Sequence, residues 1–230
     1  LMKGMKPALI ADRNLHKAEK AFADANISKD MYIIAATVEE AEKAIGEGKY
    51  VITTDVSLAT RAAQIQAVID CTGMPDIGAR IALDAIENKK HIIMLNVETD
   101  IVIGHLLKKK ADEAGVVYTG SAGDEPGAVM ELYDFATALG FEVMAFGKGK
   151  NNKLNFNANP DTAREEAERK SMSPRMLASF QDGTKTMVEM TAMCNATGFL
   201  PDVTGGHGPS ATVDQLPKVF SLLSEGGILN

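Results

Sequence analysis

The sequence predicts an α/β fold: a doubly wound parallel sheet followed by a smaller α+β domain. Short apolar runs alternate with amphipathic helical stretches from Pro7 to Gly120, an alternation typical of a parallel sheet with helices on both faces. After Gly140 longer helical stretches and polar loops follow instead. We therefore expect two domains, residues 1–140 and 141–230.

Each element of the first domain follows from this alternation. Acidic residues stand near the expected helix starts, where they act as caps or favourable first-turn charges; they are Asp12, Asp55, Asp76 and Asp100. The expected strands are Ala8–Ala11, Tyr50–Thr53, Ala67–Cys71, His91–Leu95 and Val116–Thr119. The expected helices are Leu15–Ala25, Val38–Gly46, Ser57–Ala63, Asp76–Asn88 and Ile101–Ala114.

The second domain is expected to begin with a strand at Phe141–Phe146 and to continue with helices. Pro174 suits the first turn of one of them, and the methionines of another are typical of core packing rather than of a cofactor site. The expected helices are Asp161–Lys170, Ser173–Phe180, Asp182–Thr197 and Val213–Ser224.

Composition excludes several classes of protein. The chain has 230 residues and a net charge of −7, which argues against nonspecific nucleic-acid binding, because such binding needs a basic face. No signal peptide or membrane-spanning apolar run is evident, so we expect a cytoplasmic protein without a membrane partner. Cys71 and Cys194 are expected to be buried free thiols. No His, Cys or Asp spacing predicts a metal site.

Polar residues follow the predicted strands, and ligands of doubly wound sheets bind at the carboxyl ends of strands. The segment ALIADRN resembles the second strand of a dinucleotide-binding fold. Asp12 there would favour NAD and Arg13 would favour NADP, while a plain helix cap is the alternative for Asp12. The expected cofactor-binding residues are Asp12, Arg13, Thr72, Gly73, Asn96 and Glu98.

A second resemblance covers the segment VIDCTGMPDIGARIALDAIENKKHIIMLNVETD and its continuation to GDEPG. It resembles the nucleotide-binding domain of homoserine dehydrogenase-like proteins, in which a strand ends in A-T-G and a later one in Asn-Lys. Cys71-Thr72-Gly73 and Ala82–His91 match, as does Asn96, but Val97 replaces the lysine of the family. GDEPG also departs from the glycine-rich loop of the family. These departures point to the branch with a C-terminal SAF domain, which includes deoxyxylulose phosphate reductoisomerase-like enzymes.

The resemblance implies a role for each part of the chain. Residues 1–140 would be an incomplete Rossmann-type, NAD(P)-binding domain, because the first strand and its G-x-G-x-x-G turn would precede Leu1. Residues 141–230 would bind the substrate, carry the catalytic groups and mediate a homodimer. The chain is thus expected to be a central fragment.

A lysine-rich cluster, GKGKNNKLN, follows the predicted strand at Phe141–Phe146. Lys148, Lys150 and Lys153 could hold a phosphate or carboxylate, with Asn152 beside them. A solvated basic turn is the alternative.

Acidic and basic residues near the other predicted helices complete the candidate site. Lys185 and Glu189 lie one helical turn apart after Asp182, and the resemblance implies a proton-transfer pair there. A surface ion pair is the alternative. Asp124 and Glu125 in GDEPG are paired acids at a predicted helix start; they would cap this helix, or Glu125 would face the substrate or the nicotinamide. His207 lies exposed between glycines in TGGHGP.

These observations predict an NAD(P)-dependent oxidoreductase that transfers hydride to or from a small phosphorylated or carboxylated carbonyl or alcohol. The expected catalytic residues are Lys153, Lys185, Glu189 and Glu125. The expected substrate-binding residues are Lys148, Lys150, Asn152, Asp182 and His207. The alternative is a noncatalytic ligand-binding or regulatory module that retains the fold.

Overall fold

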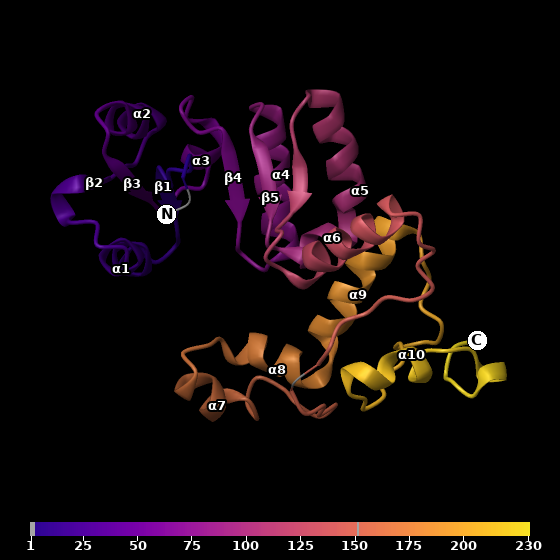
Figure 1. Cartoon of the computed structure of the whole chain (residues 1–230). Helices are drawn as coiled ribbons and strands as arrows, with labels where there is room; N and C mark the ends of the chain where they lie inside the picture. Colours follow the sequence, from indigo (N-terminus) through magenta and orange to yellow (C-terminus); the bar gives the residue numbers. More distant parts are fainter. Residues whose placement is uncertain (1–2, 151) are drawn as a thin grey trace. The chain divides into compact units, whose positions relative to one another are not determined.

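The computed structural model describes residues 3–150 and 152–230, and it divides into two compact units, residues 1–121 and 122–230 (Figure 1). We predicted a domain boundary near Gly140, so this division lies earlier in the chain. The reason is the helix α6 (Glu125–Ala138), which packs against α9 (Thr184–Thr197) of the second unit.

The first unit confirms the predicted α/β class with parallel strands (Figure 1). Its described strands form two three-stranded sheets, in the orders β1-β3-β2 and β4-β5-β6, and no ladder joins β1 to β4. The first sheet contains β1 (Leu9–Ala11), β2 (Tyr32–Ile34) and β3 (Tyr50–Thr53). The second contains β4 (Ala67–Asp70), β5 (His91–Met94) and β6 (Tyr118–Gly120).

One strand, β2, is absent from the prediction. It follows the 3-10 turn η1 (Lys29–Met31) and has only three residues, which is too short for an alternating pattern to stand out. The ring of Tyr32 lies 5.4 Å from that of Phe22 in α1, so packing against this helix helps to hold the strand.

The helices of the first unit start at local signals that the sequence contains. Thr37 and Glu40 form a reciprocal capping box before α2, and the side chain of Asn96 accepts from the Thr99 amide to cap α5. This cap starts α5 before the predicted Ile101. The helices are α1 (Leu15–Asp24), α2 (Val38–Gly46), α3 (Ser57–Arg61), α4 (Pro75–Glu87) and α5 (Val97–Ala114).

The largest apolar core of the described residues lies between the second sheet and the helices α4 and α5. Ile92 and Leu107 are fully buried in it, and Ile81 and Met94 are nearly so. Burial of this size supplies most of the favourable free energy of folding. Cys71 lies outside this core: it is exposed, so the prediction that it is buried was wrong, and Cys194 is partly exposed.

A buried polar network connects β4, α4 and α5. Asn96 is fully buried and donates from Nδ2 to Asp70 Oδ2 (2.9 Å) and Thr72 Oγ1 (3.1 Å). Its Nδ2 also lies 3.0 Å from the carbonyl oxygen of Met74. Since unpaired buried polar groups are costly, these bonds fix the loop at the carboxyl end of β4.

The second unit is helical where the structure describes it. Its helices after α6 are α7 (Arg164–Arg169), α8 (Pro174–Asp182), α9 and α10 (Leu216–Val219), with the 3-10 turns η2 (Val213–Gln215) and η3 (Leu223–Glu225). The single helix predicted at Val213–Ser224 is therefore divided into three short ones.

The strand predicted at Phe141–Phe146 is wrong, because these residues form no regular structure. Phe146 packs edge-on against Phe199, with 5.1 Å between the ring centroids, whereas Phe141 and Met144 are exposed. One anchored side chain cannot replace a neighbouring strand. The α+β expectation for this part reduces to helices and one isolated bridge, Leu222 to Leu229.

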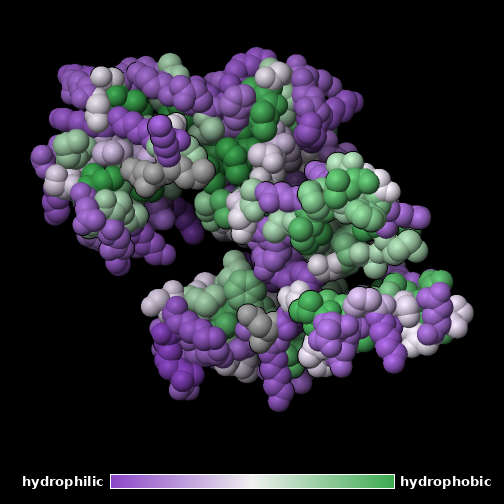
Figure 2. All heavy atoms as spheres, viewed as in Figure 1, coloured by the Kyte–Doolittle hydropathy of each residue, from purple (hydrophilic) through white to green (hydrophobic). Residues whose placement is uncertain are grey.

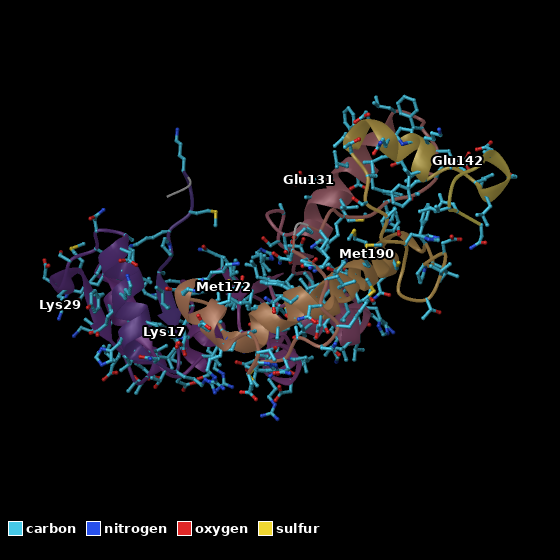
Figure 3. The ribbon with its side chains drawn as sticks, turned by 90° about the horizontal axis from the view of Figure 1, so that it is seen from below. Lys17, Lys29, Glu131, Glu142, Met172 and Met190 are labelled. Atoms are coloured by element: carbon cyan, nitrogen blue, oxygen red, sulfur yellow. The ribbon has the colours of Figure 1, made fainter. Side chains whose placement is uncertain are left out.

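Apolar side chains gather on the visible face around α6 (Figure 2). Leu132 and Phe135 of α6 and Leu139, the residue that follows it, are 59–69% exposed. Among the methionines of α9, Met193 is buried, as core packing predicts, and Met190 is partly exposed (Figure 3). None of the helices that the structure describes has the length and apolar content to cross a membrane.

We predict that Gly78→Ala destabilises the first unit. A Cβ at this position would lie 2.3–2.4 Å from atoms of Thr99, Asn96 and Asp70, so the polar network would have to shift, at a cost of about 2 kcal/mol. Urea unfolding measures the change. Gly46→Ala is the matched control, because its Cβ would meet nothing within 4 Å. Equal stability of the two variants would contradict the role of the network.

Candidate functional site

The second unit contains a pocket of about 560 Å³. It lies where the start of α6, the segment that follows α6, the end of α8 and the start of α9 meet. Its lining is mainly charged and polar, as expected for a small polar ligand. The lining residues are Glu125, Lys148, Gly149, Lys150, Asn152, Phe180, Lys185 and Thr186.

Lys148 is the central cation of this pocket. Its Nζ lies 2.9 Å from Glu125 Oε1 and also pairs with a carboxylate oxygen of Glu189. The side chain of Lys148 is 13% exposed, and that of Glu189 is 2% exposed. Burial lowers the pKa of Lys148, but its hydrogen bonds to Glu189 and Glu125 outweigh burial and raise it. Lys148 is therefore held as an ammonium group.

Asp124 and Glu125 form an interacting acid pair at the start of α6. Burial, followed by a hydrogen bond to Glu125, raises the pKa of Asp124 to about 6, and the nearby charge of Lys185 opposes this shift. Hydrogen bonds to Asp124 and Lys148 lower the pKa of Glu125 to about 2. Two carboxyl groups that hydrogen-bond to each other share a proton, so this pair can exchange a proton near neutral pH.

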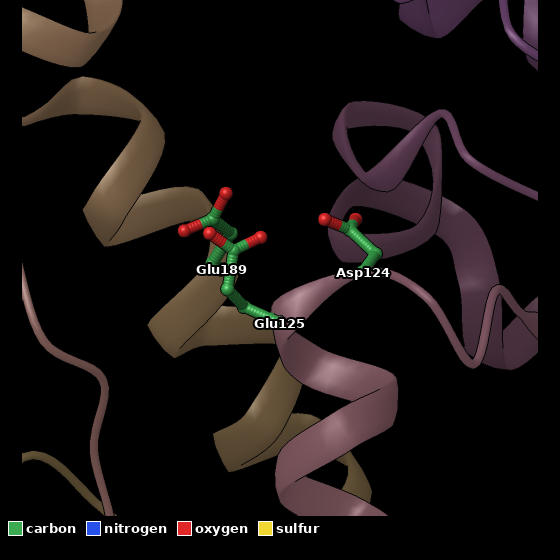
Figure 4. A group of neighbouring side chains, drawn as sticks. All are labelled: Asp124, Glu125 and Glu189. Atoms are coloured by element: carbon green, nitrogen blue, oxygen red, sulfur yellow. The ribbon is translucent and has the colours of Figure 1, made fainter.

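Glu189 completes an acid–lysine cluster, by which we mean Asp124, Glu125, Glu189 and Lys148. One carboxylate oxygen from each acid lies within 4.8 Å of the others (Figure 4). Such a group needs a compensating positive charge. The ammonium of Lys148 provides it here, since it pairs with Glu125 and Glu189.

A second set of polar groups lines the pocket next to this cluster. Lys185 and Thr186 belong to the first turn of α9, where the helix dipole favours an anion. Lys150 donates to the carbonyl oxygen of Phe180, near the end of α8. An ammonium group has three donors, so Lys150 can also bind a ligand. This part of the pocket suits a phosphate or a carboxylate.

Six of the residues that the sequence predicts are thus brought together in the second unit: Glu125, Lys148, Lys150, Asn152, Lys185 and Glu189. Glu189 pairs with Lys148, a contact that the predicted i,i+4 pair of Lys185 and Glu189 does not include. Lys153 is exposed and is not among the lining residues.

Asp182 and His207 also lie outside the pocket lining. The carboxylate of Asp182 accepts from the Thr184 amide (2.8 Å) at the start of α9. His207 Nε2 lies 2.5 Å from Asp202 Oδ2, and this hydrogen bond lowers the pKa of Asp202. Asp202 also accepts from the backbone amide of Asn230, so His207 belongs to a separate polar contact.

The predicted cofactor-binding residues all lie at strand ends or helix starts of the first unit. Asp12 accepts from the Asn14 amide (2.8 Å). The alternative interpretation of Asp12 as a helix cap is wrong, because Asn14 caps α1. Arg13 and Thr72 are exposed, and Gly73 has a positive φ of 63°. Asn96 is buried in the polar network, and Glu98 lies in the first turn of α5.

Phe180 and Thr186 were not predicted as part of the site, and Asp124 was considered only as an acid paired with Glu125 at a helix start. The adjacent acids of GDEPG were a usable signal for Asp124, since like charges side by side perturb each other. Phe180 and Thr186 carry no such signal, because their places in the lining depend on how α8 and α9 pack.

Comparison with known proteins gives one informative match. Residues 123–230, just under half of the chain, match the family described as "Oxidoreductase DRL, catalytic domain". This range coincides with the second unit and contains the whole pocket. The match supports the class of oxidoreductases for this chain. No curated protein sequence matches.

Several solved structures are distantly similar, of which two serve as examples. YvaA from Bacillus subtilis, provisionally named an oxidoreductase, is 16% identical, with a TM-score of 0.40 over 84% of this chain and 53% of that one. The WlbA dehydrogenase from Bordetella pertussis, in complex with NADH and UDP-GlcNAcA, is 17% identical, with a TM-score of 0.32 over 57% and 42%. The chain thus spans about half the length of these structures, and neither similarity is close enough to transfer a function.

We predict that Glu189→Ala destabilises the second unit by about 3 kcal/mol, because it leaves the partly buried Lys148 without its buried partner. Hydrogen exchange of the α9 amides measures this loss. Glu131→Ala, an exposed position on α6 (Figure 3), should change stability by less than about 0.5 kcal/mol. If the α9 amides exchange hydrogen at the same rate in both variants, the ion pair does not stabilise this unit appreciably.

The acid pair also predicts a specific pH dependence. The pKa of Asp124 in the folded state, about 6, lies above its ordinary value of 3.8, so the folded state binds this proton more tightly than the unfolded state does. The stability that this proton contributes is therefore lost as the pH rises from about 4 to about 6. The folded pKa of Glu125, about 2, lies below 4.5, so its contribution is lost as the pH falls from about 4.5 to about 2.

Asp124→Asn should remove the loss of stability between about pH 4 and about pH 6, and it should keep the loss that Glu125 causes at lower pH. Urea unfolding of the wild type and this variant across that pH range measures both. A wild-type stability that does not change between about pH 4 and about pH 6, relative to the variant, would refute the shared proton.

Proposed function

We propose that this chain is part of an NAD(P)-dependent oxidoreductase whose pocket in the second unit holds a small phosphorylated or carboxylated carbonyl or alcohol. The observation that carries the proposal is the acid–lysine cluster, because it lies inside the region that matches an oxidoreductase catalytic domain. A homoserine dehydrogenase-like or reductoisomerase-like reaction, and a homodimer, are the finer forms of this proposal.

Lys148 is the residue that we assign to the reacting oxygen of the substrate. A buried ammonium group next to a carbonyl oxygen stabilises the negative charge that develops when hydride is added. Glu189 and Glu125 keep Lys148 charged and oriented. The Asp124–Glu125 pair adjoins Lys148 through Glu125, and it would supply the proton that the new alcohol requires.

The other end of the substrate would lie beside Lys150, Lys185 and Asn152. Their ammonium and amide groups, together with the first turn of α9, supply donors for an anionic group. A bound anion would orient the carbonyl toward Lys148, and such positioning contributes strongly to rate.

A nicotinamide dinucleotide supplies or accepts the hydride when it is bound. The first unit fits such a cofactor in part, since parallel strands end in the polar residues Asp12, Arg13 and Thr72. Asn96 fits a supporting role, because its amide group is already engaged in the buried network. Asp12 favours NAD and Arg13 favours NADP.

We predict that Lys148→Met lowers kcat at least about 100-fold, because the charge at the reacting oxygen is lost, and leaves cofactor binding unchanged. Turnover is measured with the intact protein, NADH or NADPH and a set of phosphorylated and carboxylated carbonyl compounds, and binding by nucleotide fluorescence. Lys218→Met, an exposed lysine of α10, is the matched control. An intact protein that binds neither nucleotide would favour the noncatalytic module instead.

A further inference from the structure

The acid–lysine cluster has more carboxyl groups than ammonium groups. Asp124, Glu125 and Glu189 bring three carboxyl groups within 4.8 Å of one another, and Lys148 pairs with two of them. Asp124 is partly compensated by the charge of Lys185. The hydrogen bond between the side chains of Asp124 and Glu125 needs a shared proton. The cluster can therefore hold one exchangeable proton beside the pocket, and it loses this proton as the pH rises above about 6.

The same lysine that acts on Asp124 also lines the anion-binding part of the pocket. Lys185 and Thr186 stand at the start of α9, with Lys150 nearby in the lining. An anion beside Lys185 would offset the charge that now favours ionised Asp124, and it would add negative charge of its own. Both effects favour the protonated form of the acid pair.

We propose that this pocket takes up one proton when it binds an anionic ligand, and that the Asp124–Glu125 pair holds that proton. The inference deepens the proposed function, on which it rests for the identity of the pocket. Proton uptake would serve the reaction, because reduction of a carbonyl to an alcohol consumes one proton for each hydride.

The charged groups around the acid pair come from three elements. Asp124 and Glu125 belong to the start of α6, Lys148 and Lys150 to the segment after it, and Lys185 and Glu189 to α9. Lys148 stays an ammonium group, because its hydrogen bonds to two carboxylates raise its pKa. The pKa of Asp124, at about 6, places its proton exchange within reach of neutral pH.

Isothermal titration calorimetry with sulfate tests the linkage without turnover. Sulfate stays a dianion between about pH 5.5 and about pH 8, so any proton taken up belongs to the protein. In wild type, we expect the sulfate affinity to fall up to about tenfold per pH unit above pH 6. Titrations at about pH 7.5 in buffers of different ionisation enthalpy should give an uptake that approaches one proton per sulfate, because Asp124 is largely ionised at this pH before sulfate binds.

Three variants locate the proton and the anion. Asp124→Asn should bind sulfate with an affinity independent of pH and without proton uptake. The side chain of Asp124 makes no capping hydrogen bond to α6, so α6 should be retained. Asp134→Asn removes the same charge from an exposed position of α6 and should behave as wild type. Lys185→Gln should weaken sulfate binding at every pH.

Several results would overturn the proposal: no measurable sulfate binding at about pH 5.5, binding without proton uptake in the wild type at about pH 7.5, proton uptake that persists in Asp124→Asn at that pH, or an unchanged affinity in Lys185→Gln. These outcomes are separate from a failure of the proposed function. A protein that binds sulfate with a proton but oxidises or reduces nothing would retain the linkage and lose only the oxidoreductase assignment.

Discussion

The ion pair between Lys148 and Glu189 is the interaction on which the second unit depends. It joins a segment without regular structure to α9, and the contact of Lys148 with Glu125 extends it to α6. A carboxylate as buried as that of Glu189 needs a positive partner, since an uncompensated charge in this place would be very costly. Lys148 thus fixes the path of the segment and lines the pocket, so the same ion pair supports both the fold of this unit and its candidate site.

Local signals explain why much of the first unit could be predicted. Val38–Gly46 and Tyr50–Thr53 were predicted with the bounds that the structure gives them, because a capping box precedes the one and turn residues flank the other. The strand predicted at Phe141–Phe146 was wrong because strand formation depends on contacts that are not local. Its apolar residues are typical of a strand, but a strand needs a neighbouring strand to pair with. Phe146 packs against the ring of Phe199 instead.

The candidate site divides in the same way. Residue types and loop position were enough to select Lys148, Lys150 and Lys185, which the structure places around one pocket. The partner of Glu189 could not be predicted, because helical spacing favours a residue one turn away and the observed partner lies 41 residues earlier in the chain. The sequence gives no means to rank Lys148 above Lys153, since that difference arises only when the segment packs between α6 and α9.

A noncatalytic ligand-binding module would need the basic lining of the pocket, but it would gain little from the acid–lysine cluster. Buried ion pairs are seldom more stable than apolar side chains of similar volume, so stability alone is a weak reason to keep Lys148 between two carboxylates. An anion site also binds less tightly when three acids lie beside it. A fixed ammonium group next to an acid pair with a shared proton is, however, what carbonyl reduction requires, since charge and proton must both be supplied at the reacting oxygen. The free-energy cost of burying these charges is therefore better explained by a catalytic role than by stability or by ligand binding alone.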